Sequence, residues 1–142
     1  MYSNIVVGTD GSPTAKTALQ HAIELAASAG ATIHIVSAYR SKGVPITVGT
    51  DAESWTVDDR TRVDAVLDAA AATARTKGLT VETHAVERDP GDAIVEVAGE
   101  VGADVVVVGN KGMRGAKRFL LGSVPNKVAH NAPCTVVIVK TT

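Results

Sequence analysis

Short runs of β-branched residues alternate with helical patterns along the whole chain, and this order leaves few folds open. Five runs rich in Val and Ile have the length of strands, at residues 5–7, 32–36, 79–86, 105–108 and 135–139. Apolar residues recur at helical spacing between each run and the next. Because a strand, a covering helix and a second strand form a right-handed crossover, the order predicts an α/β fold, an open parallel sheet of five strands with helices on both faces.

Capping signals predict where the helices begin and end. The four helices are expected to begin at Ser12 followed by Pro13, near Thr56, at Asp89 followed by Pro90, and after Ser123. Thr56 and Asp59 have the spacing of a capping box with Asp in place of Glu. Glycines at positions 30, 78 and 102 are expected to end the first three helices. Residues 39–55 show no clear element and are expected to form a long connection.

The pattern within each run predicts its place in the sheet. The third run alternates apolar and polar residues, as a half-exposed edge strand does, whereas the first, fourth and fifth are continuously apolar. We therefore expect helices to cover both faces of the fifth strand.

Composition excludes several classes of protein. The 142 residues carry 14 basic and 15 acidic side chains, a formal net charge of −1, and few aromatic residues, which argues against nucleic-acid binding. A single cysteine, Cys134, excludes an internal disulfide. No apolar run approaches the roughly 18 residues of a membrane span, and no secretory leader is recognisable, so a cytoplasmic protein without a membrane partner is expected. The length predicts one domain over residues 1–142.

Two loops that follow strands are the expected ligand site, because ligands bind at the carboxyl ends of the strands in such sheets. The first is GTDGS, residues 8–12, and the second is GNKGMRGAKRFLLGS, residues 109–123. The second loop holds four of the 13 glycines, which permit positive φ and close approach to an anion, and it ends at an expected helix start. It also carries four basic residues, Lys111, Arg114, Lys117 and Arg118. These features predict a phosphate-binding loop; the alternative is a solvated basic loop with turn glycines.

Other candidate residues are less informative. Asp10 either bonds sugar hydroxyls or a phosphate-bound Mg²⁺, or merely forms the turn before the first helix. The four histidines, at positions 21, 34, 84 and 130, show no metal-ligand spacing. Cys134 is expected to be a small packed residue. The P-loop and the dinucleotide-binding glycine motif are both absent from the sequence.

The glycine spacing is that of a known signature. Gly109, Gly112, Gly122 and Ser123 form the pattern G-x2-G-x9-G-[ST]. This pattern, together with VVGTDGS near the start and LLGSVPNKVAHNAPCTVVIVK at the end, resembles the universal stress protein family in its ATP-binding branch. The resemblance implies a Rossmann-like sheet of the adenine nucleotide alpha hydrolase-like type with strand order 3-2-1-4-5. It covers nearly the whole chain.

The resemblance also implies a set of binding residues. Asp10 would contact ribose or the Mg²⁺ that accompanies ATP, with Thr9 beside it, and the Ala38 backbone would recognise adenine. The glycine loop would bind ribose and phosphates through Gly109, Gly112, Arg114, Gly115, Gly122, Ser123 and Val124. The nucleotide would be ATP or a related adenine nucleotide, AMP or cyclic AMP.

Three functions follow from this resemblance. The first is a nucleotide-binding regulatory protein of the stress response, a homodimer through its last strand that signals to an unknown protein partner. The second is a slow ATPase or phosphotransferase using the same site, for which the sequence offers only Asp10 near the phosphates. The third is an interaction module that needs no nucleotide, which the intact glycine signature disfavours.

Overall fold

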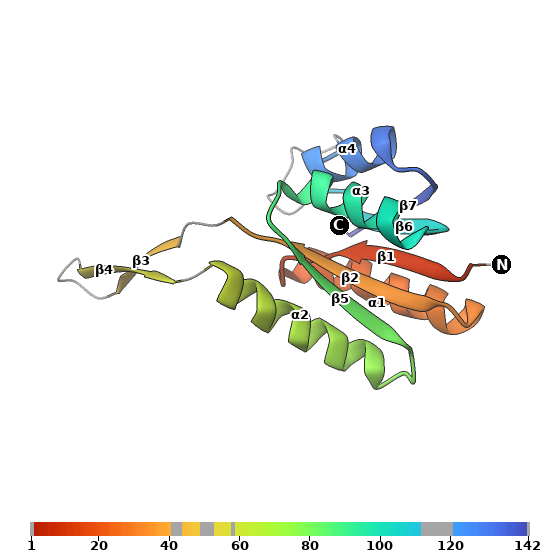
Figure 1. Ribbon diagram of the computed structural model, residues 1–142, viewed down its shortest axis with the longest axis horizontal. Coiled ribbons are helices and arrows are strands. Elements are labelled where there is room, and N and C mark those ends of the chain that lie inside the picture. The colour runs from red at the N-terminus through yellow and green to blue at the C-terminus, as the bar shows by residue number, and fades with distance from the viewer. Residues whose placement is uncertain (1, 41–43, 49–52, 58, 112–120, 142) are drawn as a thin grey trace.

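The molecule is built around a parallel sheet with two helices on each face (Figure 1). The computed structural model describes residues 2–40, 44–48, 53–57, 59–111 and 121–141. The sheet contains β1 (Asn4–Gly8), β2 (Thr32–Ala38), β5 (Val81–Val86), β6 (Val105–Gly109) and β7 (Thr135–Val139). Its order, β5-β2-β1-β6-β7, is the predicted order 3-2-1-4-5 of the five expected strands.

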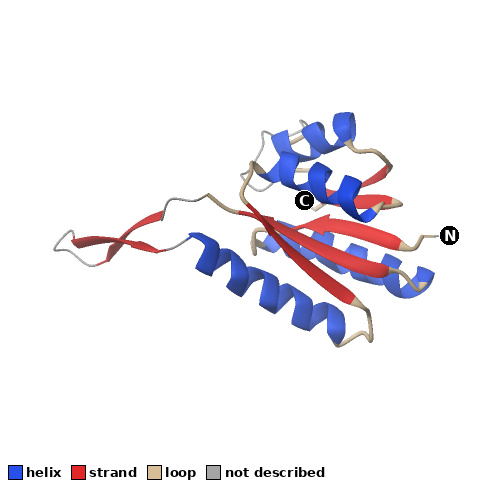
Figure 2. Ribbon diagram, in the orientation of Figure 1, coloured by secondary structure: helices blue, strands red, loops and turns tan. Residues whose placement is uncertain are grey.

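The helices form two layers, which Figure 2 shows on either side of the strands. The four helices are α1 (Pro13–Ala29), α2 (Asp59–Arg75), α3 (Pro90–Val101) and α4 (Ser123–Asn131). Helices α1 and α2 pack on one face over residues such as Ile5 and Ile33, whereas α3 and α4 pack on the other over Val6 and Val106. Alternate residues of the same strand thus belong to two separate cores.

Helix α1 begins and ends where its capping residues predict. The Ser12 hydroxyl accepts a hydrogen bond from the Ala15 N–H at 3.3 Å, and Pro13 is the first helical residue. Gly30 follows the helix in the left-handed conformation, with φ 67°. The inward-facing residues are the predicted ones, Ala15, Ala18, Leu19, Ala22, Ile23 and Ala26.

A hairpin occupies the segment in which no element was expected. Strands β3 (Val44–Val48) and β4 (Glu53–Val57) pair antiparallel, with Ile46 opposite Trp55, and Figure 1 shows them extending away from the main sheet. Thr56 lies in β4, so the prediction that α2 starts near it is wrong; α2 begins at Asp59. The missed signal is the β-branched content on both sides of the Gly49–Asp51 turn residues, which favours strands over loop or helix.

The two edge strands differ in how they are covered. Strand β5 lies at one edge and alternates in exposure, as its sequence predicts. At the other edge, Val137 is 36% exposed and Ile138 is 42% exposed, on opposite faces of β7. The expectation that helices cover both faces of this strand is therefore wrong. The reason is that α4 is only nine residues long and packs chiefly against α3, and that on the other face α1 packs mainly over β6 and barely reaches β7.

No helix in the described part of the chain is both long and apolar enough to cross a bilayer.

Candidate functional site

The carboxyl ends of β1 and β6 lie side by side and open the candidate site. The chain leaves β1 for β2 on one side and leaves β6 for β7 on the other, so the strand order reverses between β1 and β6. Ligands of open α/β sheets bind at such a reversal. A pocket of about 20 Å³ opens here, lined by Gly8, Thr14, Ala15, Val108, Gly109, Val124, Pro125 and Thr141. That is room for about one water molecule, so a larger ligand would lie over the pocket.

The turn from β1 to α1 is held by its own polar side chains. Thr9 is buried; its N–H donates to the Val36 carbonyl at 2.9 Å, and its hydroxyl accepts from the Gly11 N–H at 3.1 Å. Asp10 Oδ1 accepts from the Ser12 N–H at 2.9 Å. Gly11 has φ 82°, which favours glycine. Asp10 was expected either to bind a ligand or to form the turn before the first helix. Its Oδ1 atom does form the turn, while its Oδ2 atom has no hydrogen-bond partner in the described part of the chain.

The glycine-rich loop leaves and rejoins the fold at one point. The Gly122 N–H donates to the Asn110 carbonyl at 3.0 Å, which joins the two ends of the loop. The Asn110 N–H donates in turn to the Val139 carbonyl at 2.9 Å and ties this point to β7. Among the predicted site residues, Gly112, Arg114 and Gly115 lie outside the described residues, as do Lys117 and Arg118.

Helix α4 begins one residue earlier than expected and lacks a side-chain cap. Its N-cap is Gly122, with φ −64° and ψ 166°, and among the described residues no side chain accepts a hydrogen bond from the first turn. Neither Gly122 nor Gly109 has a positive φ, so the expectation that the loop glycines are there to permit positive φ is wrong for these two. The first four N–H groups of a helix have no partner within it. Here the Gly122 N–H is bonded to Asn110 and Pro125 has none, which leaves the N–H groups of Ser123 and Val124.

Asn110 is a residue that the sequence interpretation missed. Its side-chain oxygen accepts from both the N–H and the hydroxyl of Thr141, at 2.8 Å and 2.9 Å. This contact brings Thr141 against Gly109, where an added Cβ would lie 3.2 Å from the Thr141 Cγ2 atom. Gly109 is therefore needed for close packing beside the pocket. An Asn directly after the fourth predicted strand was the available signal.

Ala38 lies at the same edge of the sheet as the two loops. It is the last residue of β2 and is half-buried, two residues beyond Val36, which pairs with Gly8. The structure thus brings Thr9, Asp10, Ala38 and Gly109 to one edge, with the start of α4 joined to it through Asn110.

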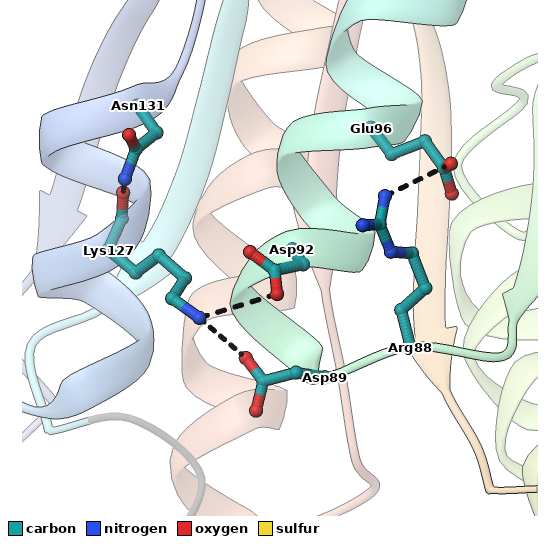
Figure 3. Close-up of polar contacts among 6 residues, drawn as sticks. All are labelled: Arg88, Asp89, Asp92, Glu96, Lys127 and Asn131. Carbon is teal, nitrogen blue, oxygen red and sulfur yellow. Dashed lines mark hydrogen bonds and ion pairs between the residues drawn. The ribbon is translucent and has the colours of Figure 1, made fainter.

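An ion-pair cluster links the middle of α4 to the first turn of α3 (Figure 3). The Lys127 ammonium donates to Asp89 Oδ2 at 3.3 Å and to Asp92 Oδ2 at 3.4 Å, at the first turn of α3. These hydrogen bonds raise the pKa of Lys127. Next to them, Gly91 allows close approach of the helices, because an added Cβ would lie 2.8 Å from the Lys127 Cδ atom.

The chain is similar over nearly its whole length to known proteins of one family. The model of the universal stress protein family matches residues 1–140. The universal stress protein Rv1636 of Mycobacterium tuberculosis is 36% identical over 99% of this chain and 98% of its own. A universal stress protein solved in complex with cAMP has a TM-score of 0.77 at 35% identity, covering 99% of this chain and 98% of its own. A universal stress protein of Archaeoglobus fulgidus solved in complex with dAMP has a TM-score of 0.71 at 28% identity, with 98% of both chains covered.

Proposed function

The chain belongs to the universal stress protein family, and from this premise we propose that it binds an adenine nucleotide, ATP or cyclic AMP, over the carboxyl ends of β1 and β6. Bound nucleotide would make the protein a regulatory sensor in a stress response, with residues 1–142 acting as one domain. Two related structures, 35% and 28% identical to this chain, were solved with cAMP and dAMP, which supports the proposal that the ligand is an adenine nucleotide.

The observation that carries the proposal is the open start of α4. The Ser123 and Val124 N–H groups have no partner in the described part of the chain and sit at the positive end of the helix dipole. Ser123 is exposed, and the N-cap, Gly122, has no side chain to occupy the place of an anion. A phosphate accepted by both N–H groups would supply the missing cap. Gly122, Ser123 and Val124 are the residues that we assign to the outer phosphates.

The opposite wall of the site supplies groups for the rest of the nucleotide. The Oδ2 atom of Asp10, which bonds none of the described residues, is an acceptor for ribose hydroxyls, or a ligand for the Mg²⁺ that accompanies ATP. Thr9 is buried and its hydroxyl is bonded within the turn, so its role is to shape the loop. The Ala38 backbone at the end of β2 is assigned to the adenine edge, and Gly109 to the ribose and α-phosphate.

Calorimetry with ATP, ADP, cyclic AMP and GTP tests the proposal. We expect an adenine nucleotide to bind with a Kd between submicromolar and about tens of micromolar, because charge-assisted hydrogen bonds contribute about 1.5–3 kcal/mol each before the cost of association. GTP should bind less well. Phosphate release from ATP in the same samples would favour the slow ATPase instead. Absence of binding by every adenine nucleotide up to millimolar concentration would leave only the interaction module.

A matched pair of variants at Ser123 tests the helix start directly. Ser123→Pro removes one of the two free N–H groups, and proline is well tolerated at the first position of a helix. We expect this variant to bind the nucleotide roughly 10- to 100-fold more weakly with unchanged circular dichroism, because one charge-assisted hydrogen bond is lost. Ser123→Ala removes only the hydroxyl and should bind within a few-fold of the wild type. Equal binding by both variants and the wild type would place the phosphates elsewhere.

We also propose a homodimer formed through β7. This strand is the last in the sheet and no described strand pairs with its outer edge, and Val137 and Ile138 are exposed on its two faces. An apolar edge strand with free N–H and carbonyl groups readily pairs with a second copy. The dimer would also cover side chains that the helices leave exposed.

A further inference from the structure

Strand pairing brings two of the four histidines together with a glutamate, outside the residues assigned to the nucleotide. His34 on β2 lies opposite Glu82 on β5, and the next residue on the same face of β5 is His84. All three are on the α3 face of the sheet. The absence of metal-ligand spacing in the sequence therefore did not indicate that His34 and His84 meet. These residues are 50 positions apart, and only the β2–β5 register makes them neighbours.

The three side chains converge through atoms that can ligate a metal. His34 Nδ1 lies 3.1 Å from His84 Nε2 and 3.1 Å from Glu82 Oε2, and all three atoms lie within 4.8 Å of one another. Two ligand atoms that are each bound tetrahedrally to one zinc ion would be about 3.3 Å apart, given Zn–N and Zn–O distances near 2.0–2.1 Å. The separations to His34 are therefore close to those of a zinc site before any movement.

A neighbouring side chain orients the buried histidine. His34 is 3% exposed, and its Nε2 atom lies 3.0 Å from Asn4 Oδ1, an acceptor on β1. The proton of a neutral imidazole is thus held on Nε2, which leaves the Nδ1 lone pair aimed at His84 and Glu82. Burial, the largest influence, lowers the pKa of His34 and favours this neutral form. Metal-bound histidines commonly have such an acceptor behind the ring.

Without a cation, the three side chains have more hydrogen-bond acceptors than donors facing one another. The Nδ1 lone pair of His34 and the Glu82 carboxylate are both acceptors, and they lie 3.1 Å apart. The His84 N–H can satisfy only one of them. A cation among the three atoms would remove the repulsion and accept all three lone pairs.

We propose that His34 Nδ1, His84 Nε2 and the Glu82 carboxylate bind one Zn²⁺ ion. Two imidazoles and one carboxylate are ligands that favour zinc over Mg²⁺. The Glu82 side chain is 60% exposed and His84 is half-buried, so the ion would be reached from solvent and a water would complete its coordination. Because the ligands come from β2 and the edge strand β5, bound zinc would clamp β5 to the sheet.

Titration of the full chain, prepared without a histidine tag, with zinc chloride tests the proposal. We expect one ion per chain by calorimetry and elemental analysis, and a rise in Tm because only the folded chain holds the three ligands together. Titration with Co²⁺ should give the visible absorption of a low-symmetry site. Ser123→Pro should retain zinc binding, so failure of the nucleotide proposal would not affect this result.

The variants avoid buried His34, whose loss could unfold the chain. His84→Gln and Glu82→Gln should each weaken zinc binding by at least about 100-fold, since each removes one of three protein ligands. Asn4→Ala removes only the acceptor behind His34 and should weaken binding by about 10- to 100-fold. His21→Gln and His130→Gln replace exposed histidines elsewhere and should bind as the wild type does. Absence of stoichiometric zinc in the wild type, or equal losses in the control variants, would overturn the proposal.

Discussion

Asp59 shows how a single buried carboxylate joins two elements. Its Oδ2 atom accepts from the Arg40 N–H at 2.7 Å, directly after β2, and its Oδ1 atom pairs with the Arg62 guanidinium at 2.6 Å. The carboxylate therefore closes the base of the segment that carries the β3–β4 hairpin. Burial alone would raise the pKa of Asp59, but the hydrogen bonds from Arg40 and Arg62 outweigh it and lower the pKa below its usual value.

The lowered pKa has a consequence for stability against pH. A group with a lower pKa in the folded state stabilises the protein above its unfolded pKa, and this contribution is lost as the pH falls through the folded pKa. We expect Asp59→Asn to cost about 1–3 kcal/mol near neutral pH, because the amide cannot accept both sets of donors. The variant should then lose less stability than the wild type as the pH falls to the ordinary pKa of an aspartate and below it, because only the wild type has the Asp59 carboxylate to protonate.

Urea unfolding at neutral and acidic pH measures both effects. Asp64→Asn is the matched control, since Asp64 is exposed and pairs with Arg60 at 3.0 Å one turn away on α2. Exposed pairs of this kind contribute only a few tenths of a kcal/mol. Similar losses in the two variants would contradict the role assigned to Asp59.

Helices α3 and α4 pack against each other at Lys127 and Gly91. Lys127 reaches across from α4 to Asp89 and Asp92, and Gly91 lets the two helices approach (Figure 3). Arg88 and Glu96 form a further pair at 3.2 Å on the outer side of α3. Because exposed ion pairs contribute little, the close approach at Gly91 is the stronger constraint on where α4 starts.

Two glycines of α3 should respond in opposite ways to alanine. At Gly91 an added Cβ would lie 2.8 Å from Lys127 Cδ and 3.2 Å from Lys127 Cβ, so the helices must shift, and we expect a loss of about 1–3 kcal/mol. At Gly99 an added Cβ meets nothing within 4 Å, and alanine should stabilise the helix by about 0.5–1 kcal/mol. Thermal and urea unfolding of both variants measure the difference. Stabilisation by Gly91→Ala would show that α4 has room to move.

The pairing of β7 with β6 determines which β7 residues would face a second copy in the proposed dimer. The Val139 carbonyl accepts from the Asn110 N–H, so the backbone of Val139 points toward β6. Polar backbone groups alternate in direction along a strand, so Val137 also points toward β6, whereas Val136 and Ile138 point to the free edge. The sequence alone left this parity open.

Because the backbone N–H groups of β7 point alternately toward β6 and toward the free edge, one pair of proline variants tests the dimer. Ile138→Pro removes an outward N–H and should give a folded monomer, because proline is tolerated where an edge N–H faces solvent. Val137→Pro removes an N–H bonded to β6 and should lower the Tm markedly. Light scattering and circular dichroism distinguish the two effects. A wild type that is strictly monomeric at tens of micromolar would contradict the dimer.

Local patterns predicted the parts of this fold that depend on neighbours in the chain. The β-branched runs, the Ser12–Pro13 helix start and the glycines at 30 and 102 act over a few residues, and the structure confirms each of them as a strand, a cap or a left-handed helix end. Gly78 is also left-handed, three residues after the end of α2. The sheet order followed from the alternation of the third run and from the family resemblance. Hairpin β3–β4 was also visible locally, in β-branched runs on both sides of turn residues, and was missed.

Contacts between residues distant in the chain were decided only by the tertiary structure. The exposure of Ile138 depends on where α4 packs and that of Val137 on where α1 packs, and the Gly122 N–H is bonded to Asn110 at the start of α4. His34 and His84 meet because β2 and β5 pair in one register. A residue's neighbours across a sheet depend on how the strands are ordered and aligned, and no short window of sequence contains that information.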